Sequence, residues 1–194
     1  MAKIIGLTGG IGSGKTSLAN YIKTLGIPVY NSDERAREIS NSPKIIEAVK
    51  AEFGNHLIKN GLLDRGRLAE IVFNDSDKLS KLNKIIHPTV LKDFKDWVQK
   101  HSNSPILIKE AAILFESGSY KDCDFIITVV APTEEKIKRV IARDKIKKEE
   151  VLKRMKNQWT DEQRIENSDY VIENLNITKA EEEISKILKI LMNS

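Results

Sequence analysis

The chain has 194 residues, of which 40% are hydrophobic and 31% are charged, and it carries a formal net charge of +4 with a single cysteine, Cys123. This length suits one domain, or one core with a modest insertion, and excludes two large independent domains. The single cysteine excludes a disulfide framework and a cysteine-rich zinc site, and no run reaches the roughly 18 uninterrupted apolar residues of a membrane helix.

Short apolar runs alternate with longer helical patterns along the chain, which is typical of an α/β fold whose parallel sheet is covered by helices. Each run is continuous rather than alternating, as expected for a strand that is buried on both faces. The sequence therefore predicts a five-stranded parallel sheet, formed by residues 4–7, 28–30, 106–108, 125–130 and 170–172.

Three helices are predicted from apolar spacing and from end signals. Residues 18–25 place apolar side chains at helical spacing and are followed by Gly26, a common helix-ending residue. Pro43 suits the first turn of a second helix. Thr178 and Glu181 have the spacing of a capping box, so we expect the last helix to begin there and to bury its apolar stripe.

Two insertions interrupt this alternation. Residues 32–104 separate the second and third strands, and they predict helices near 64–73, 77–86 and 89–100. A long helical insertion after the second strand often forms a substrate-binding lobe. Residues 133–168 form a second insertion that is helical and heavily charged. We therefore expect one domain over residues 1–194 that carries two helical insertions.

The segment from Gly9 to Thr16 matches the pattern G-x-x-x-x-G-K-[ST], directly after the first strand and before a helix. Its glycines let backbone N–H groups point at a phosphate chain, while Lys15 can reach the outer phosphates and the Thr16 hydroxyl can bind Mg²⁺. A glycine-rich turn can match by chance, but the strand and helix on either side favour a functional loop. We expect contacts to a nucleotide from Gly10, Ile11, Gly12, Ser13, Gly14, Lys15, Thr16 and Ser17.

A phosphate loop of this kind predicts a P-loop NTPase-type three-layer fold, but it occurs in kinases, GTPase switches and ATPases alike. The guanine-selecting N/T-K-x-D signature is absent, because the strings that begin at Asn83 and Thr178 lack the aspartate. No D-x-x-G stands at the end of the third strand. A GTP switch is therefore disfavoured, and an ATP-dependent kinase for a small molecule fits better.

Asp33 is the candidate for the group that accepts the proton of the acceptor hydroxyl. It follows the second strand at its carboxyl end, which is the edge where ligands bind in open α/β sheets. Asp33 could instead be the N-cap of a helix over residues 34–39. One carboxylate cannot easily fill both roles, so both interpretations remain open.

Arg139 and Arg143 are candidates for stabilising the charge of the transferred phosphoryl group. Their i, i+4 spacing puts them on one helix face, where both guanidinium groups can reach one phosphate cluster. Glu135, four residues before Arg139, offers the alternative of a solvated helix face that is held by ion pairs. Spacing alone does not decide between the two.

An ordered set of further motifs accompanies the segment from Gly6 to Thr16. These motifs are Ser32-Asp33 with Ala36-Arg37, Leu63-Asp64-Arg65 with Leu68 and Val72-Phe73, His87-Pro88, Leu114-Phe115-Glu116, Arg139 with Arg143-Asp144, Arg154 with Gln158, and Asp169 to Asn174. The phosphate loop is shared by many families, whereas the ordered set is far more specific. In these motifs the chain resembles the dephospho-CoA kinase family over nearly its whole length.

The resemblance implies ATP-dependent phosphorylation of the ribose 3′-hydroxyl of dephospho-CoA, giving CoA and ADP with Mg²⁺. It implies that Asp33 is the catalytic base, that residues 32–104 form the CoA-binding lobe, and that residues 133–168 form a lid carrying Arg139 and Arg143. This reaction is the last step of coenzyme A biosynthesis.

The resemblance also implies roles for four residues outside the phosphate loop. Arg37, Arg65 and His87 match positions near the acceptor in that family, and Asn174 matches a position near the adenine. His87 could equally be a histidine at a helix end before Pro88.

Four positions depart from the family pattern, one of them Ala112, where the family commonly has a proline. Asn31 replaces the first acid of an Asp-x-Asp motif that ends at Asp33, so any role of that acid is lost. Glu110 stands where the family commonly has Asp, at a strand end where its carboxylate could hold a water on Mg²⁺, and Lys136 stands where a glutamine is usual.

The alternatives are a kinase for another hydroxyl acceptor, such as a nucleoside or shikimate, and an NTP-dependent nucleic-acid-binding protein. Aromatic residues are only 6% of the chain, and none forms a stacking platform. Residues 134–164 hold 11 Lys and Arg against 7 Asp and Glu, which accounts for the whole net charge. We therefore expect an anionic small-molecule substrate and no nucleic acid, in a cytoplasmic monomer or small homo-oligomer that does not bind membranes.

Overall fold

The computed structural model describes residues 2–73 and 75–193, and it divides into two compact units. The first unit comprises Met1–Asn31 and His101–Ser194, and the second comprises Ser32–Lys100. Each unit has its own cluster of buried apolar side chains, so each is described by itself.

The first unit is built on a parallel sheet of five strands, which confirms the predicted α/β class and strand number. The strands are β1 (Lys3–Thr8), β2 (Val29–Asn31), β5 (Ile106–Glu110), β6 (Phe125–Val130) and β7 (Tyr170–Glu173). Their order across the sheet is β2-β5-β1-β6-β7. Because neighbouring strands run in parallel, their carboxyl ends meet at one edge, where Leu7 and Asn31 both lie opposite Glu110.

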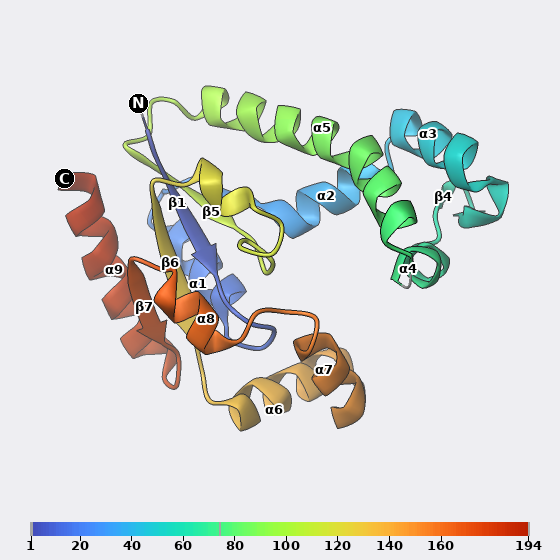
Figure 1. Cartoon of the computed structure of the whole chain (residues 1–194). Coiled ribbons are helices and arrows are strands. Elements are labelled where there is room, and N and C mark those ends of the chain that lie inside the picture. Colours follow the sequence, from blue (N-terminus) through green and yellow to red (C-terminus); the bar gives the residue numbers. More distant parts are fainter. Residues whose placement is uncertain (1, 74, 194) are drawn as a thin grey trace. The chain divides into compact units, whose positions relative to one another are not determined.

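Two helices, α1 (Lys15–Thr24) and α9 (Ile177–Asn193), contact each other and cover one face of this sheet (Figure 1). Ile5 and Leu7 of β1 are buried in the cluster that these helices complete. Gly6 faces the opposite layer, where a Cβ would lie 2.7 Å from Leu114. The missing side chain therefore allows the chain that follows β5 to pack closely on the sheet.

The opposite layer contains the short 3₁₀ helix η2 (Ser119–Asp122) and α8 (Asp161–Glu166), which contacts β6. The second insertion supplies α8 together with α6 (Thr133–Asp144) and α7 (Lys148–Met155). Helices α6 and α7 pack around Ile137, Val140 and Val151. The insertion is therefore helical, as predicted, and α6 and α7 have a small apolar core of their own.

The predicted capping box of the last helix is wrong. Helix α9 begins at Ile177, and the side-chain oxygen of Asn176 accepts the Lys179 N–H at 3.2 Å, so Thr178 lies within the first turn. An Asn side chain can cap a helix as well as Thr does. A capping box occurs in α8 instead, between Thr160 and Gln163.

The second unit contains α2 (Ser32–Ser40), α3 (Pro43–Phe53), the 3₁₀ helix η1 (Asn55–Leu57), α4 (Arg65–Phe73) and α5 (Ser76–Lys100). Helices 77–86 and 89–100, predicted as separate, are one helix with Pro88 inside it. Proline removes one helical hydrogen bond and usually costs about 3 kcal/mol. The buried side chains of Leu82 and Phe94, one on each side of Pro88, show how tertiary packing holds both halves in place.

A hairpin in the second unit was not predicted. Strands β3 (Ile58–Lys59) and β4 (Leu62–Leu63) pair in antiparallel fashion across Asn60 and Gly61. Both turn residues have positive φ, 53° and 77°. An Asn-Gly pair is the strongest short-range signal for such a turn, so the sequence did contain the information.

No helix in the described part of the chain is both long enough and apolar enough to cross a bilayer.

Candidate active site

The phosphate loop joins β1 to α1 through a backbone that requires glycine at two positions. Gly12 and Gly14 have φ values of 83° and 93°, which other residues rarely adopt. A Cβ on Gly12 would lie 2.4 Å from the backbone oxygen of Lys136, and one on Gly14 would lie 2.0 Å from Asn174 Nδ2. The loop is thus held between α6 and the end of β7, and it leads into the N-terminus of α1, where an anion is favoured.

Lys15, Thr16 and Glu110 form a polar cluster at the edge where β1 and β5 end. The Thr16 hydroxyl donates to Glu110 Oε1 at 3.2 Å, and Lys15 Nζ lies 3.5 Å from the same oxygen. The Glu110 side chain is only 2% exposed. The sequence predicted Lys15 and Thr16 beside a triphosphate and the Glu110 carboxylate near Mg²⁺, and the structure brings the three side chains together.

This cluster fits a magnesium ion. Mg²⁺ prefers oxygen ligands and usually keeps several waters, so it needs only one or two protein groups. The Thr16 hydroxyl and the Glu110 carboxylate provide neighbouring oxygens. Glu110 Oε2 is buried and has no hydrogen-bond partner within residues 2–73 and 75–193, which leaves it available for a metal-bound water. No group of three His, Cys, Asp or Glu in that part of the chain could hold a metal by itself.

Arg139 contacts the back of the phosphate loop. Its Nη2 donates to the backbone oxygen of Asn174 at 2.7 Å, and its Nη1 donates to the backbone oxygens of Ser13 and Gly12 at 3.4 and 3.5 Å. Asn174 in turn donates from Nδ2 to the Ser13 oxygen at 2.9 Å. These contacts bring Arg139 and Asn174 together at one side of the loop. Glu135, the alternative partner of Arg139, accepts a hydrogen bond from Lys138 at 2.7 Å.

Arg143 does not converge with Arg139 on one point. It belongs to what we call the exposed cluster, in which Arg143 and Arg154 both donate to the Asp144 carboxylate, at 2.7 and 2.9 Å. The hydrogen bond from Arg143 holds the pKa of Asp144 below its ordinary value, and the same bond raises the pKa of Arg143. The exposed cluster thus joins the end of α6 to α7 through one shared carboxylate.

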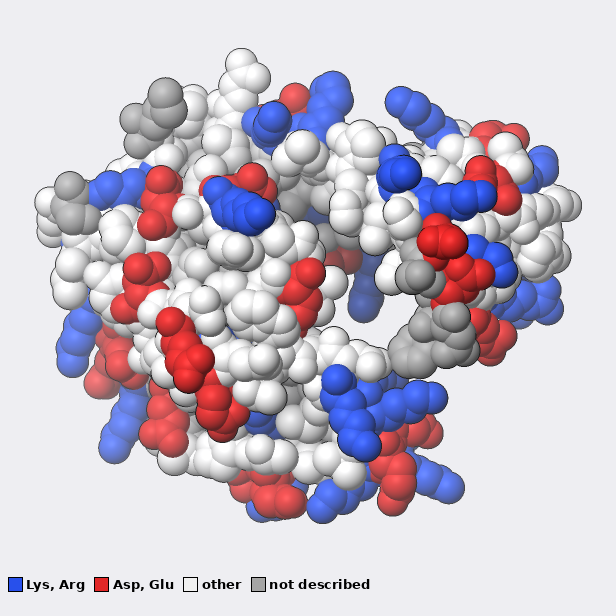
Figure 2. Space-filling view, in the orientation of Figure 1, with Lys and Arg blue, Asp and Glu red and all other residues white. Residues whose placement is uncertain are grey.

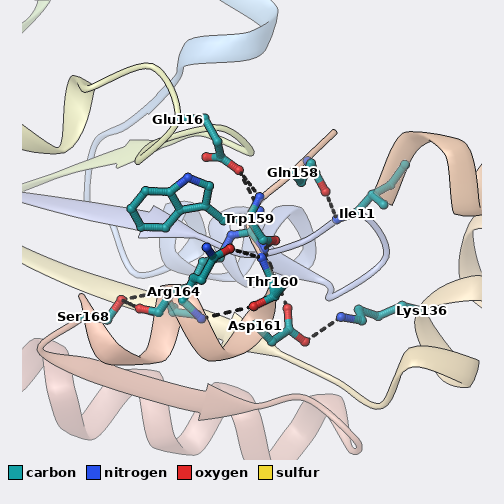
Figure 3. A network of polar contacts seen from close by, with 11 residues as sticks. Ile11, Glu116, Lys136, Gln158, Trp159, Thr160, Asp161, Arg164 and Ser168 are labelled. Atoms are coloured by element: carbon teal, nitrogen blue, oxygen red, sulfur yellow. Dashed lines mark hydrogen bonds and ion pairs between the residues drawn. The ribbon is translucent and has the colours of Figure 1, made fainter. Parts of the chain in front are cut away.

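A second group of charges, which we call the buried cluster, consists of Glu116, Lys136, Asp161 and Arg164 (Figure 3). Lys136 Nζ donates to Asp161 Oδ2 at 2.5 Å, and Arg164 Nη2 donates to Glu116 Oε1 at 3.0 Å. Burial lowers the pKa of Arg164, whereas the charges of Glu116 and Asp161 raise it. The position that departs from the family pattern, Lys136, therefore has an acidic partner within the chain.

Sequence reasoning missed the buried cluster, and it gave Gln158 no role. Gln158 Oε1 accepts the Ile11 N–H of the phosphate loop at 2.9 Å (Figure 3). Gln158, Trp159 and members of the buried cluster line a cavity of about 690 Å³ beside Gly10. Gln158 and Glu116 both occur in the motifs that carry the family resemblance, and this was the one available signal.

The acceptor-side candidates lie in the second unit. Asp33 is the second residue of α2, so it lies within the first turn and is not the N-cap of a helix over 34–39. Arg37 lies in the last turn of α2. His87 lines a shallow cavity of about 530 Å³ along α5, and it lies inside that helix rather than at its end. The side chain of Arg65 lies outside the described residues.

Basic side chains gather over α7, with acidic side chains among them (Figure 2). They belong to residues 134–164, which carry the whole net charge of the chain. Arg164 and Lys136 from this segment are neutralised inside the buried cluster. Without Lys136, the acidic and basic side chains of α6 balance, so the exposed positive charge of this segment comes largely from Lys145, Lys147 and Lys156, which flank α7.

Comparison with known proteins gives a consistent result. A family model described as dephospho-CoA kinase matches residues 3–180. A protein of Fusobacterium nucleatum named dephospho-CoA kinase is 44% identical over 172 residues, which cover 88% of this chain and 89% of that relative.

Solved structures agree with this match. A crystal structure of a Thermus thermophilus protein is 32% identical with a TM-score of 0.91, and the match covers 97% of each chain. A dephospho-CoA kinase from Campylobacter jejuni is 25% identical with a TM-score of 0.72, and the match covers 100% of this chain and 98% of that one.

Proposed function

The chain belongs to the dephospho-CoA kinase family, which catalyses the final step of CoA biosynthesis, and we propose that it transfers the γ-phosphoryl group of ATP to the ribose 3′-hydroxyl of dephospho-CoA with the residues described above. The observation that carries this proposal is the cluster of Lys15, Thr16 and Glu110 beside the glycine loop. The cluster supports the proposal because a cation, a hydroxyl and a buried carboxylate lie together next to the loop that is expected to hold the outer phosphates and Mg²⁺.

The nucleotide is held by the loop and by its neighbours. The backbone N–H groups from Gly12 to Ser17 surround the phosphates, and Gly10 and Ile11 shape the loop. Arg139, which contacts the carbonyl oxygens of Gly12 and Ser13, fixes the side of the loop next to Asn174. Arg143 supplies charge to the phosphates from the lid, and Asn174 lies near the adenine.

Thr16 would bind Mg²⁺ directly, and Glu110 would hold one of its waters. The bound ion supplies positive charge against the phosphate oxygens. Lys15 then has two partners, since its ammonium group lies next to Glu110 and reaches the outer phosphates. Glu110 Oε2, which has no hydrogen-bond partner among the described residues, supports this assignment.

The chemical step is an in-line displacement. Asp33 accepts the proton of the 3′-hydroxyl, and the hydroxyl oxygen bonds to the γ-phosphorus as the bond from that phosphorus to the bridging oxygen breaks. ADP leaves with the electron pair of that bond. Arg37, Arg65 and His87 bind the acceptor within residues 32–104, and residues 133–168 act as the lid that keeps water out.

We also infer that the protein works in the cytoplasm as a monomer or small homo-oligomer, without nucleic acid. The family acts on a small molecule, and the basic side chains over α7 are interspersed with acidic ones rather than forming a continuous basic stripe (Figure 2).

An acceptor panel tests the assignment. The protein is mixed with ATP, Mg²⁺ and, in separate reactions, dephospho-CoA, a nucleoside and shikimate, and release of ADP is followed. We expect turnover with dephospho-CoA alone. Equal turnover with a nucleoside, or with water, would contradict the proposed acceptor.

A substitution tests the base. Asp33→Asn is expected to lower kcat by about 10²–10⁴-fold, because a loose transition state depends only partly on a base. Glu34→Gln, next to it in the first turn of α2, is the matched control and is expected to retain activity. Full activity of Asp33→Asn would show that the carboxylate has no chemical role.

A further inference from the structure

The phosphate loop is fixed at its tip by a side chain from the far end of the lid insertion. Gln158 Oε1 accepts the backbone N–H of Ile11 at 2.9 Å, across 147 positions of sequence. Because this N–H is used by Gln158, the peptide between Gly10 and Ile11 has a defined orientation (Figure 3). The peptides that follow it are those expected to surround the phosphates.

Other contacts limit movement on both sides of this bond. The Ile11 side chain packs into the apolar cluster of α6 and α7 that contains Ile137 and Val151. A Cβ on Gly10 would lie 3.4 Å from Asp161 Oδ1 and 3.6 Å from Arg164 Nη1, so the buried cluster lies directly against the loop. The tip is therefore held by one hydrogen bond and by apolar packing.

The segment that presents Gln158 is itself held. The backbone N–H of the next residue, Trp159, donates to Glu116 Oε1 at 2.7 Å. The Trp159 ring stacks on Phe115, with ring centroids 4.9 Å apart. Arg164, whose side chain is 1% exposed, donates to the Trp159 oxygen and to the same Glu116 oxygen. Gln158 thus projects from a segment that is tied to the chain following β5, and its position does not depend on α7 alone.

We propose that Gln158 is a positioning residue of this kinase: it orients the phosphate loop through the Ile11 N–H and does not contact the nucleotide. The proposal rests on the proposed function for its phosphate-binding role. A single hydrogen bond of this type changes an equilibrium by about 2- to 10-fold, so loss of the acceptor oxygen weakens nucleotide binding by that factor.

Three variants of the full chain test this. Gln158→Met keeps the length of the side chain and removes the acceptor, whereas Gln158→Glu keeps an acceptor oxygen and adds a negative charge. Gln163→Met is the matched control, since Gln163 is an exposed glutamine that caps α8 and does not contact the loop. The affinity for ADP with Mg²⁺ is measured by calorimetry without acceptor, and the exchange of the Ile11 amide proton is followed by NMR.

The expected order of affinity is wild type, then Gln158→Glu within about 2-fold, then Gln158→Met, with faster exchange at Ile11 only in the Met variant. An affinity lower for Glu than for Met would mean that the side chain faces the phosphates, and it would overturn the proposal. Unchanged affinity in Gln158→Met, or an equal loss in Gln163→Met, would also overturn it.

This test is independent of the acceptor. If the wild-type protein binds ADP but does not phosphorylate dephospho-CoA, the proposed function fails while the order of the variants still decides the role of Gln158.

Discussion

The insertion between β6 and β7 contributes side chains to two charged clusters that are built in opposite ways: the exposed cluster lies within it, and the buried cluster also includes Glu116 from the chain after β5. In the buried cluster, the Arg164 and Lys136 side chains are 1% and 5% exposed, and each has a carboxylate partner. In the exposed cluster, the Arg143 and Arg154 side chains are 62% and 50% exposed, and they share the single carboxylate of Asp144.

This difference separates residues that fix the fold from residues that are available to a substrate. Removing one partner of a buried ion pair costs about 3–5 kcal/mol, because the other charge is left without compensation. Exposed pairs contribute only about 0–1 kcal/mol, since water and salt replace them easily. The exposed cluster can therefore exchange Asp144 for a phosphate group at little cost, while the buried cluster cannot rearrange.

The largest expected effect comes from breaking the buried cluster. Arg164→Met leaves the Glu116 carboxylate, whose side chain is 18% exposed, without its cation, so we expect the free energy of unfolding to fall toward the roughly 3–5 kcal/mol of a broken buried pair. Urea unfolding measures this change. Arg154→Met in the exposed cluster is the control and is expected to cost less than about 1 kcal/mol. Similar losses in the two variants would contradict the distinction.

A second substitution sharpens this test. Glu116 Oε2 and Arg164 Nε are buried and have no hydrogen-bond partner in the described part of the chain, so the pair is incompletely satisfied. Replacing both charges, as Glu116→Leu with Arg164→Met, is therefore expected to recover part of the lost stability. If the double variant is less stable than Arg164→Met, Glu116 stabilises the fold through contacts other than its pairing with Arg164.

The exposed cluster gives the opposite pattern, with an effect on rate rather than on stability. Arg143→Met removes a charged hydrogen-bond donor proposed to reach the phosphates, so we expect kcat to fall by about 10- to 100-fold. The free energy of unfolding should change by less than about 1 kcal/mol. Steady-state kinetics with saturating ATP and dephospho-CoA measures the rate.

Lys138→Met is the matched control for Arg143→Met, because Lys138 is an exposed cation on the same helix whose partner is Glu135. It should retain nearly full kcat. If both variants lose rate equally, the loss of any cation on α6 lowers the rate, and the placement of Arg143 has no special role.

The sheet and the phosphate loop were predictable because they depend on local sequence. Short continuous apolar runs that alternate with helical patterns are typical of buried parallel strands, and the loop pattern contains its own glycines and lysine. The prediction of two separate helices around Pro88 was wrong, because the packing of Leu82 and Phe94 outweighs the local tendency of proline to end a helix. The Asn60-Gly61 hairpin could have been predicted, since the dipeptide itself indicates the turn.

The two clusters differ in how far the sequence could predict them. Arg143 and Asp144 are adjacent, so their pairing is local. By contrast, Arg164 meets Glu116 across 48 positions, and this contact forms only because α8 packs against β6 near the chain that follows β5. A charge count over 134–164 treats both kinds of residue alike, although burial removes Lys136 and Arg164 from the external field.

Limited proteolysis with trypsin tests which parts of the insertion are accessible. We expect the cleavage rate near α7 to change several-fold when ligands bind. Trypsin should cut the native protein at exposed sites in and around α7, such as Lys147 and Arg154, and should spare Arg164, which is buried. An ATP analogue with dephospho-CoA is expected to slow the cuts near α7, because the proposed lid closure would order that segment. Mass spectrometry of the first fragments identifies the sites. Early cleavage after Arg164 would mean that the whole insertion moves as one piece.

The smallest expected effect is the pH dependence that Asp144 of the exposed cluster contributes to stability. The hydrogen bond from Arg143 lowers the pKa of Asp144 below its ordinary value of 3.8. A carboxylate with a depressed pKa adds stability that is fully present above its unfolded-state pKa and is lost as the pH falls through its folded-state pKa. The difference in unfolding free energy between wild type and Asp144→Asn should therefore be constant from about pH 5 to pH 8 and should disappear in stronger acid.

The size of this difference should stay within the roughly 0–1 kcal/mol of exposed pairs, and added salt should reduce it. Urea unfolding of both proteins at several pH values measures it, with Glu135→Gln as a control for another exposed carboxylate whose pKa is lowered by a neighbouring cation, Lys138. A difference of several kcal/mol that resists salt would place Asp144 with the buried residues, and Arg143 would then not be free to leave it for a phosphate.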